Sequence, residues 1–402
     1  MNRWVGSVFL CFISTLLLIN CSVVAEWETC SGIVPMQNRY YKISILDFGG
    51  VGDGRTLNTK AFKEAIFRIQ HLKRRAGTLL YIPAGVYLTG PFNLTSRMTL
   101  YLARDAVIKA TQSMAIGRTS YGRGRERPGG RYMSLLHGHG LHDVIITGEN
   151  GTIDGQGDVW WNMWRQRTLR YTRPHLIELM NSGGIIISKD SSSNVCIEDS
   201  YISVGDDLVA VKSGWDQYGI AYGRSSHGIT IQRITGSSPF AGIAVGSETS
   251  GGVVDVLAEH INLFNMGVGI HIKTNIGRGG MIRNITVSNV YMENTRTAIK
   301  IAGVVGDHLD EKFNPNALPI VKGIKIKDVW GEKVLQTGLI HGLKNSPFSG
   351  ICLSNINLHG NPGQRNLPWK CSDVRGAAIQ VSPWPCTELI SSQQTGACST
   401  YF

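Results

Sequence analysis

Short apolar runs recur along most of the chain, and each run is rich in β-branched residues. They begin near residue 78 and include residues 144–146, 195–197, 229–231, 253–256 and 282–285. Gly, Asn, Ser and Asp separate the runs, which is typical of strands joined by turns. The interval between runs is irregular, at roughly 25–35 residues, within the range of repeat folds. This pattern predicts an all-β fold of stacked coils, a parallel β-helix or solenoid.

One earlier stretch has helical periodicity instead. Phe62, Ile66 and Ile69 recur at the spacing of one helix face. We expect this short helix to cap the N-terminal end of the coils, where exposed strand edges would otherwise pair with other chains. No further helices are expected between the apolar runs, which argues against a doubly wound α/β sheet. An antiparallel sandwich or barrel is the structural alternative.

The first residues have the pattern of a secretory signal. A basic start at Arg3 precedes an apolar stretch over residues 8–19 and small residues up to Ala25. We therefore predict a signal peptide over residues 1–25 and a secreted protein. The apolar stretch is shorter than the ~20 residues that a membrane span needs, so no membrane association is expected. Residues 26–402 are predicted to form a single domain, and a monomer is expected.

The cysteines and glycosylation motifs fit an extracellular protein. Six of the eight cysteines follow the predicted signal peptide, and an even number in a secreted chain predicts disulfides. The irregular tail from about residue 362 is predicted to be a C-terminal cover pinned by its cysteines. These are Cys371, Cys386 and Cys398. Sequons at Asn93, Asn150 and Asn284 predict a glycoprotein.

The charge indicates an acidic partner. The formal net charge is +11, from 40 Lys and Arg against 29 Asp and Glu. In a secreted protein, such an excess favours an acidic polymer by raising its local concentration and its rate of association. Nucleic acid is not expected, because no basic stripe is interleaved with stacking aromatics.

Two neighbouring carboxylates, Asp206 and Asp207, lie between strand-like runs in the stretch Ser203-Val204-Gly205-Asp206-Asp207-Leu208. Neighbouring residues on a strand point to opposite faces. The two acids can therefore share a face only if the backbone bends between the runs. A bend that presents two acids together is a candidate site for acid/base catalysis.

The chain resembles the plant polygalacturonases, glycoside hydrolases of pectin, over most of its length after the signal. The resemblance is carried by an ordered series of motifs. They are Asp47-Phe48-Gly49, Ile82-Pro83-Ala84-Gly85, Gly151-Thr152-Ile153-Asp154-Gly155, Arg173-Pro174-His175-Leu176-Ile177, Gly205-Asp206-Asp207 and Gly246-Ser247-Glu248. It implies a right-handed parallel β-helix in the cell wall, with pectin or polygalacturonate as partner. It implies no metal and no organic cofactor.

The resemblance also implies a mechanism, the hydrolysis of α-1,4-galacturonosyl linkages with inversion. In such a reaction one carboxylic acid protonates the leaving oxygen and a carboxylate opposite activates water. Asp206 would be the general acid and Asp207 part of the base. The family's Arg-Ile-Lys, which holds the substrate carboxylate, stands here as His271-Ile272-Lys273. Lys273 can serve as a point charge, whereas His271 is only partly charged near neutrality and cannot reproduce a bidentate guanidinium.

The chain departs from the family pattern ahead of the acid pair. The family's Asn-Thr-Asp motif, which supplies the third catalytic carboxylate, is missing, and the chain runs from Ile185 almost directly into Asp190 and Ser191. Roughly two coils, on the order of 45 residues, are absent relative to the family. Asp190 is not expected to replace the lost acid, because catalytic groups must be held within a fraction of an ångström.

Two other functions compete with an active hydrolase. A catalytically inactive pectin-binding protein would keep the basic charge without the full set of acids. A pectate lyase on the same type of fold would need a calcium-binding acid cluster, and Asp206 with Asp207 offers too few oxygen ligands for calcium. We rank the lyase last.

Overall fold

The computed structural model divides the chain into two compact units, Met1–Ile33 and Val34–Phe402. It describes residues 39–72, 74–112, 116–117, 131–171, 173–180, 182–186, 193–305, 313–361, 363, 368–389 and 398, all in the second unit. The predicted signal peptide lies outside these residues. Within the described ranges, no helix has the length and apolarity that a membrane crossing requires.

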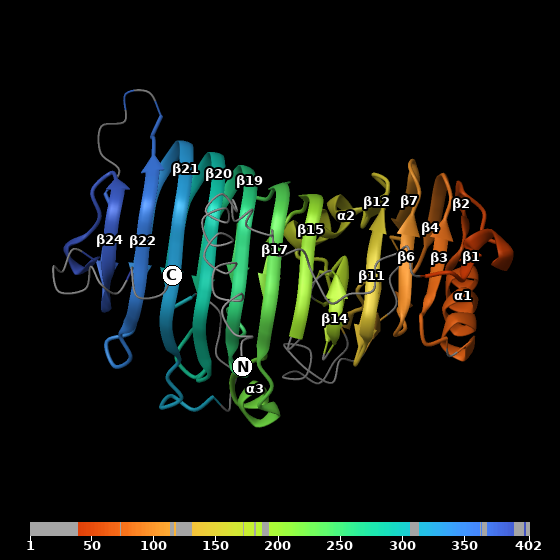
Figure 1. The fold of residues 1–402 in the computed structure, drawn as a ribbon, viewed down its shortest axis with the longest axis horizontal. Helices are drawn as coiled ribbons and strands as arrows, with labels where there is room; N and C mark the ends of the chain where they lie inside the picture. The colour runs from red at the N-terminus through yellow and green to blue at the C-terminus, as the bar shows by residue number, and fades with distance from the viewer. Residues whose placement is uncertain are drawn as a thin grey trace, which may run out of the picture. The chain divides into compact units, whose positions relative to one another are not determined.

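A long parallel sheet dominates the second unit. Its main path runs β1-β3-β6-β11-β14-β15-β17-β19-β20-β21-β22-β24, and β16, β18 and β23 join it from the side (Figure 1). The strands of this sheet are β1 (Lys42–Ser44), β3 (Thr78–Ile82), β6 (Met98–Leu102), β11 (His142–Gly148), β14 (Gly183–Ile186), β15 (Ser193–Ser203), β16 (Val209–Val211), β17 (Ser226–Ser237), β18 (Ala241–Val245), β19 (Val253–Lys273), β20 (Met281–Ala302), β21 (Ile320–His341), β22 (Phe348–Leu358), β23 (Lys370–Ser372) and β24 (Val374–Ser382).

Three smaller sheets complete the strands. Two are parallel, in the orders β12-β7-β4-β2 and β13-β10-β5, and β8 pairs antiparallel with β9. Their bounds are β2 (Asp53–Leu57), β4 (Gly85–Thr89), β5 (Phe92–Asn93), β7 (Ala106–Ala110), β8 (Ile116–Gly117), β9 (Arg131–Tyr132), β10 (Leu136–His139), β12 (Thr152–Asp154) and β13 (Ile177–Met180). The predicted right-handed parallel β-helix is confirmed.

The recurring apolar runs align in one register across the main sheet. One row of mutually paired residues passes through eight strands, and it consists of Val144, Ile185, Val195, Ile229, Val256, Ile285, Ile324 and Ile351. The members whose side chains are described are all buried. Stacking one apolar residue from each coil on the next forms a continuous core, which is why the period of the runs predicts the fold.

Polar residues with left-handed backbone form the corners of the long strands. In β19 these include His260 and Asn265, with φ of 56° and 54°. Asn and Asp tolerate this conformation better than most residues with a Cβ. The corners also bond from coil to coil, since the Asn294 amide donates to the Asn265 side-chain oxygen over 2.7 Å. Each long strand therefore bends into segments that present separate rows of side chains.

Helices are short and few. The predicted N-terminal helix is α1 (Thr59–Leu72), and it buries the expected face, with the Phe62 ring 4.5 Å from Phe92. Figure 1 places α1 beside β1 and β2, where the coils begin. Two helices that the sequence analysis does not expect are α2 (Gly157–Arg165) and α3 (Asp216–Tyr222). Two 3-10 turns, η2 (Ile45–Phe48) and η3 (Thr387–Leu389), complete the elements.

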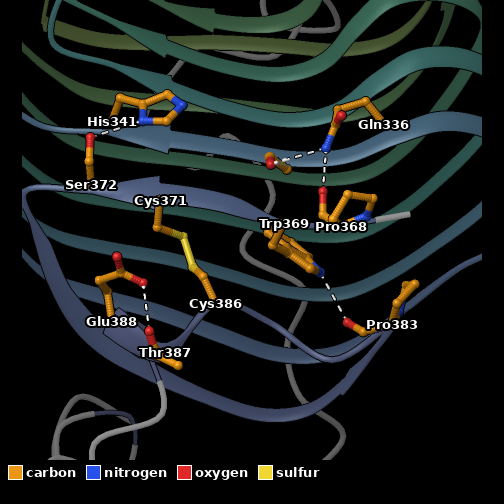
Figure 2. The surroundings of a disulfide bond; sticks show 11 residues. Gln336, His341, Pro368, Trp369, Cys371, Ser372, Pro383, Cys386, Thr387 and Glu388 are labelled. Atoms are coloured by element: carbon orange, nitrogen blue, oxygen red, sulfur yellow. Dashed lines mark hydrogen bonds between the residues drawn. A yellow bond between two sulfur atoms is a disulfide. The ribbon is translucent and has the colours of Figure 1, made fainter. Parts of the chain in front are cut away.

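Disulfides pin the C-terminal tail, as predicted. Cys371 bonds Cys386 within the segment that covers β21, and Cys352 bonds Cys398 (Figure 2 shows the first). Beside the first bridge, the Trp369 indole N–H donates to the carbonyl of Pro383 over 3.0 Å. Cys196 is disulfide-bonded as well. That the tail covers the last coils stays a prediction.

The return from β14 to β15 is unusually short. Ile185 pairs with Val195, ten residues further along the chain. By contrast, Val195 pairs with Ile229, 34 residues on, and Ile229 with Val256, 27 residues on. A parallel crossover usually needs a dozen or more residues. The connection from β14 to β15 is therefore shorter than the two connections that follow it.

Candidate active site

Asp206 and Asp207 lie where the backbone bends between β15 and β16. The ladder holds both sides of the bend, since the Val204 N–H donates to Ser237 and the Leu208 N–H donates to Ala241. The predicted bend is therefore present. It leaves the two neighbouring carboxylates with different partners and different exposure.

Asp206 is the more exposed acid, with 54% of its side chain accessible. One carboxylate oxygen accepts a hydrogen bond from the Arg173 guanidinium over 2.6 Å, and the other accepts the Asp207 N–H over 2.8 Å. Partial burial raises the pKa of this carboxyl, but the Asp207 N–H, Arg173 and Lys212 outweigh burial and hold the pKa below its usual value. In the free protein Asp206 is therefore ionised at neutral pH.

Asp207 is largely buried and is held on both oxygens. Its side chain is 11% exposed, and it forms an ion pair with the Lys273 ammonium, which is 18% exposed, over 2.6 Å. Its other oxygen accepts the Ala241 N–H over 3.1 Å. The structure thus brings together three of the predicted residues, Asp206, Asp207 and Lys273.

Arg173 also belongs to this site. The sequence marks it as part of a family motif, but does not predict that it pairs with an acid. Its guanidinium lies 3.9 Å from the centroid of the Trp161 ring and 5.0 Å from that of Trp164. Such a seat orients the cation while it pairs with Asp206. Both tryptophans lie in α2, and the strand pattern of the sequence does not predict this helix beside the acids.

Gly205 makes room for this arrangement. A Cβ at residue 205 would lie 2.0 Å from the Trp161 indole nitrogen, far closer than any normal contact. The glycine before the acid pair is therefore required by the close approach of α2. The Trp161 ring also stacks near Phe240, at 5.9 Å between centroids, which links α2 to the residue just before β18.

A second basic residue lies close to Asp206. Lys212, at the end of β16, is 20% exposed and pairs with Glu248 over 3.6 Å. Lys212 also contributes to the lowered pKa of Asp206. Glu248 belongs to the Gly246-Ser247-Glu248 motif, so this motif adds a charged residue beside Lys212.

His271 lies on the same outer face as Lys273 but is not a cation. Ile270 and Ile272, which alternate with them, are 1% and 2% exposed, so residues 271 and 273 point outward. Burial, with the nearby charges of Lys273 and Lys300, lowers the pKa of His271 to about 3. The sequence predicts a partly charged His271 near neutrality. This prediction is wrong because burial of the imidazole depends on the folded structure.

The third carboxylate has no described counterpart. Asp190 lies outside the described residues, and the paired Ile185 and Val195 lie only ten residues apart in the chain. Among the described residues, one group of three potential metal ligands occurs, Cys371, Cys386 and Glu388. Its two thiols are joined in a disulfide, so they offer no thiolate to a metal.

The structure is a parallel β-helix that carries two neighbouring acids at a bend between strands. The family model of glycosyl hydrolases family 28 matches residues 177–382, and a second model, described as rhamnogalacturonase A/epimerase, pectate lyase-like, matches residues 42–271. A probable polygalacturonase of Vitis vinifera is 43% identical, over 90% of this chain and 83% of that one. The chain belongs to glycosyl hydrolases family 28 and is a glycoside hydrolase.

More distant matches include a second curated relative and solved structures that share the fold. Polygalacturonase-2 of Solanum lycopersicum is 22% identical, over 89% of this chain and 84% of that one. Among solved structures, an exopolygalacturonase of Thermotoga maritima superposes with a TM-score of 0.59 at 24% identity, covering 80% of this chain and 87% of its own. A polygalacturonase of Erwinia carotovora gives 0.56 at 20% identity, covering 82% and 95%.

Proposed function

We propose that the protein is a secreted polygalacturonase of the plant cell wall type, which hydrolyses α-1,4-galacturonosyl linkages of pectin with inversion. The observation that carries this proposal is the acid pair at the bend after β15, in a chain of family 28 whose relatives are named polygalacturonases. The net charge of +11 suits an anionic polymer as substrate. Secretion rests on the signal pattern at residues 1–25.

In this proposal Asp206 is the general acid. It is the more exposed of the two carboxyls, so a glycosidic oxygen can approach it. It must be protonated to act, and in the free protein Arg173 and the Asp207 N–H favour its ionised form. A galacturonate carboxylate that pairs with Arg173 would weaken this effect and raise the pKa of Asp206 in the complex. Substrate binding would therefore prepare the acid.

Asp207 would act on the opposite side of the reaction, as part of the base. Lys273 and the Ala241 N–H hold its two oxygens, which fixes the orientation of the carboxylate. An inverting hydrolase needs such a carboxylate to position and activate water. Arg173 and Lys273 flank the acids, and each can also bind a sugar carboxylate by charge.

The test is the release of reducing ends from polygalacturonic acid by the purified chain. We expect release by the wild type and loss of at least about 100-fold in Asp206→Asn, the usual contribution of a positioned general acid. Asn keeps the size of the side chain and cannot donate the proton. A folded wild type that binds the polymer without cleaving it would instead identify an inactive pectin-binding protein.

A further inference from the structure

Lys300 lies beside His271 on the next coil. The two residues pair in register between β19 and β20, so their side chains share one face of the sheet. The flanking Ile299 and Ile301 are fully buried, so Lys300 points outward as Lys273 does. Neighbouring strands are about 4.8 Å apart, and a diagonal pair such as Lys273 and Lys300 is separated by roughly 7–8 Å at the backbone.

Lys300 forms no ion pair with an acid among the described residues. It is partly buried, and within the described ranges no salt bridge or hydrogen bond to its ammonium is present. Lys273, by contrast, is bound to Asp207. Lys300 therefore adds positive charge next to Lys273 that the described residues do not compensate. Such an arrangement of positive charge favours an anionic ligand.

His271 adds no positive charge to this face. It is neutral over the pH range in which proteins work, and its Nε2 atom is buried without a hydrogen-bond partner among the described residues. A carboxylate that approaches this face therefore meets two ammonium groups, that of Lys273 two residues beyond the imidazole on β19 and that of Lys300 beside it on β20.

We propose that Lys273 and Lys300 together form a carboxylate-binding site next to the acid pair, which takes the carboxylate of a uronic acid unit adjacent to the cleaved linkage. This inference rests on the proposed function and assigns Lys300 as a substrate-binding residue. The site consists of two flexible ammonium groups and no planar guanidinium, so it recognises charge more than geometry. It selects unesterified uronate over its neutral methyl ester.

The experiment measures binding of a galacturonic acid pentamer by calorimetry, in the Asp206→Asn background so that no cleavage occurs. Lys300→Met removes the charge and keeps most of the length. We expect it to weaken binding by about tenfold or more, the value of one charged hydrogen bond. Lys300→Arg should restore binding to within about threefold, because one charge-assisted hydrogen bond is retained.

Lys322→Met is the matched control. Lys322 is exposed and also lacks a described ion pair, but it lies in the first segment of β21, in register with Arg283 and not with His271. Binding should be unchanged in this control, and the fully methyl-esterified pentamer should not distinguish Lys300→Met from its parent. Thermal unfolding of each variant confirms that it folds.

The outcomes separate the two proposals. If the parent binds the pentamer and Lys300→Met binds it equally well, the carboxylate site is wrong while the proposed function stands. If Lys300→Met and Lys322→Met lose affinity alike, only the general charge of the protein matters, and the site is again wrong. If the parent itself does not bind, the proposed function fails and the inference fails with it.

Discussion

Lys273→Met is expected to destabilise the protein and to inactivate it. The substitution keeps the length of the side chain but leaves the Asp207 carboxylate with the Ala241 N–H as its one remaining described hydrogen bond. The carboxylate is 11% exposed, so water compensates little for the lost ammonium. Breaking one side of a buried ion pair generally costs more than removing both sides.

The size of the effect follows from the geometry. At 2.6 Å, and with an effective dielectric constant near 20, the attraction between the charges is about 6 kcal/mol before desolvation is subtracted. Removal of one partner of a buried pair costs roughly 3–5 kcal/mol. The lower end, about 3 kcal/mol, applies here because Asp207 keeps a hydrogen bond and slight exposure. For a unit of this size, this corresponds to a fall in Tm of about 4 °C.

The assay is thermal unfolding of a double-mutant cycle made of wild type, Lys273→Met, Asp207→Asn and the double variant. The double variant should recover part of the stability lost in Lys273→Met, because no unpaired charge remains. Lys322→Met controls for the loss of one lysine from the surface. Equal Tm values for wild type and Lys273→Met, or strict additivity in the cycle, would refute the reasoning from the buried pair.

Two further predictions concern Arg173 and Gly205. Arg173→Met removes a group that lowers the pKa of Asp206. The alkaline limb of the pH profile of kcat/KM, where the general acid loses its proton, should therefore move to higher pH. A limb at unchanged pH would show that Asp206 is not that acid. Gly205→Ala places a Cβ 2.0 Å from the Trp161 nitrogen and should cost about 1–3 kcal/mol of stability and up to about 100-fold in activity. Thermal unfolding and rate measurements on Gly205→Ala check this prediction. An unchanged rate would mean that the contact with the Trp161 ring does not position Arg173.

The period of the apolar runs was sufficient to predict the coils. Val195, Ile229 and Val256 occupy one row because every coil must place an apolar residue in the same register of the core. The alternation of residues 271 and 273 likewise placed both on one face. These features depend on local sequence and on the same register from coil to coil, so they can be predicted without a structure.

Contacts between coils that are far apart in sequence could not be predicted in this way. Arg173 reaches Asp206 across 33 residues, and its seat on Trp161 depends on a helix, α2, that the strand pattern does not reveal. Burial of His271 depends on neighbours from other coils as well. The signal for Lys300 was available, because Gly269-Ile270-His271-Ile272 and Ala298-Ile299-Lys300-Ile301 align coil on coil.

The short return from β14 to β15 makes catalysis by the chain itself the central question. The measurement that answers it is the rate of reducing-end release from polygalacturonic acid by the mature chain, compared with Asp206→Asn under the same conditions. The account predicts release by the wild type that falls at least about 100-fold in the variant. Equal rates for the two proteins, or no release by a folded wild type that binds the polymer, would contradict it.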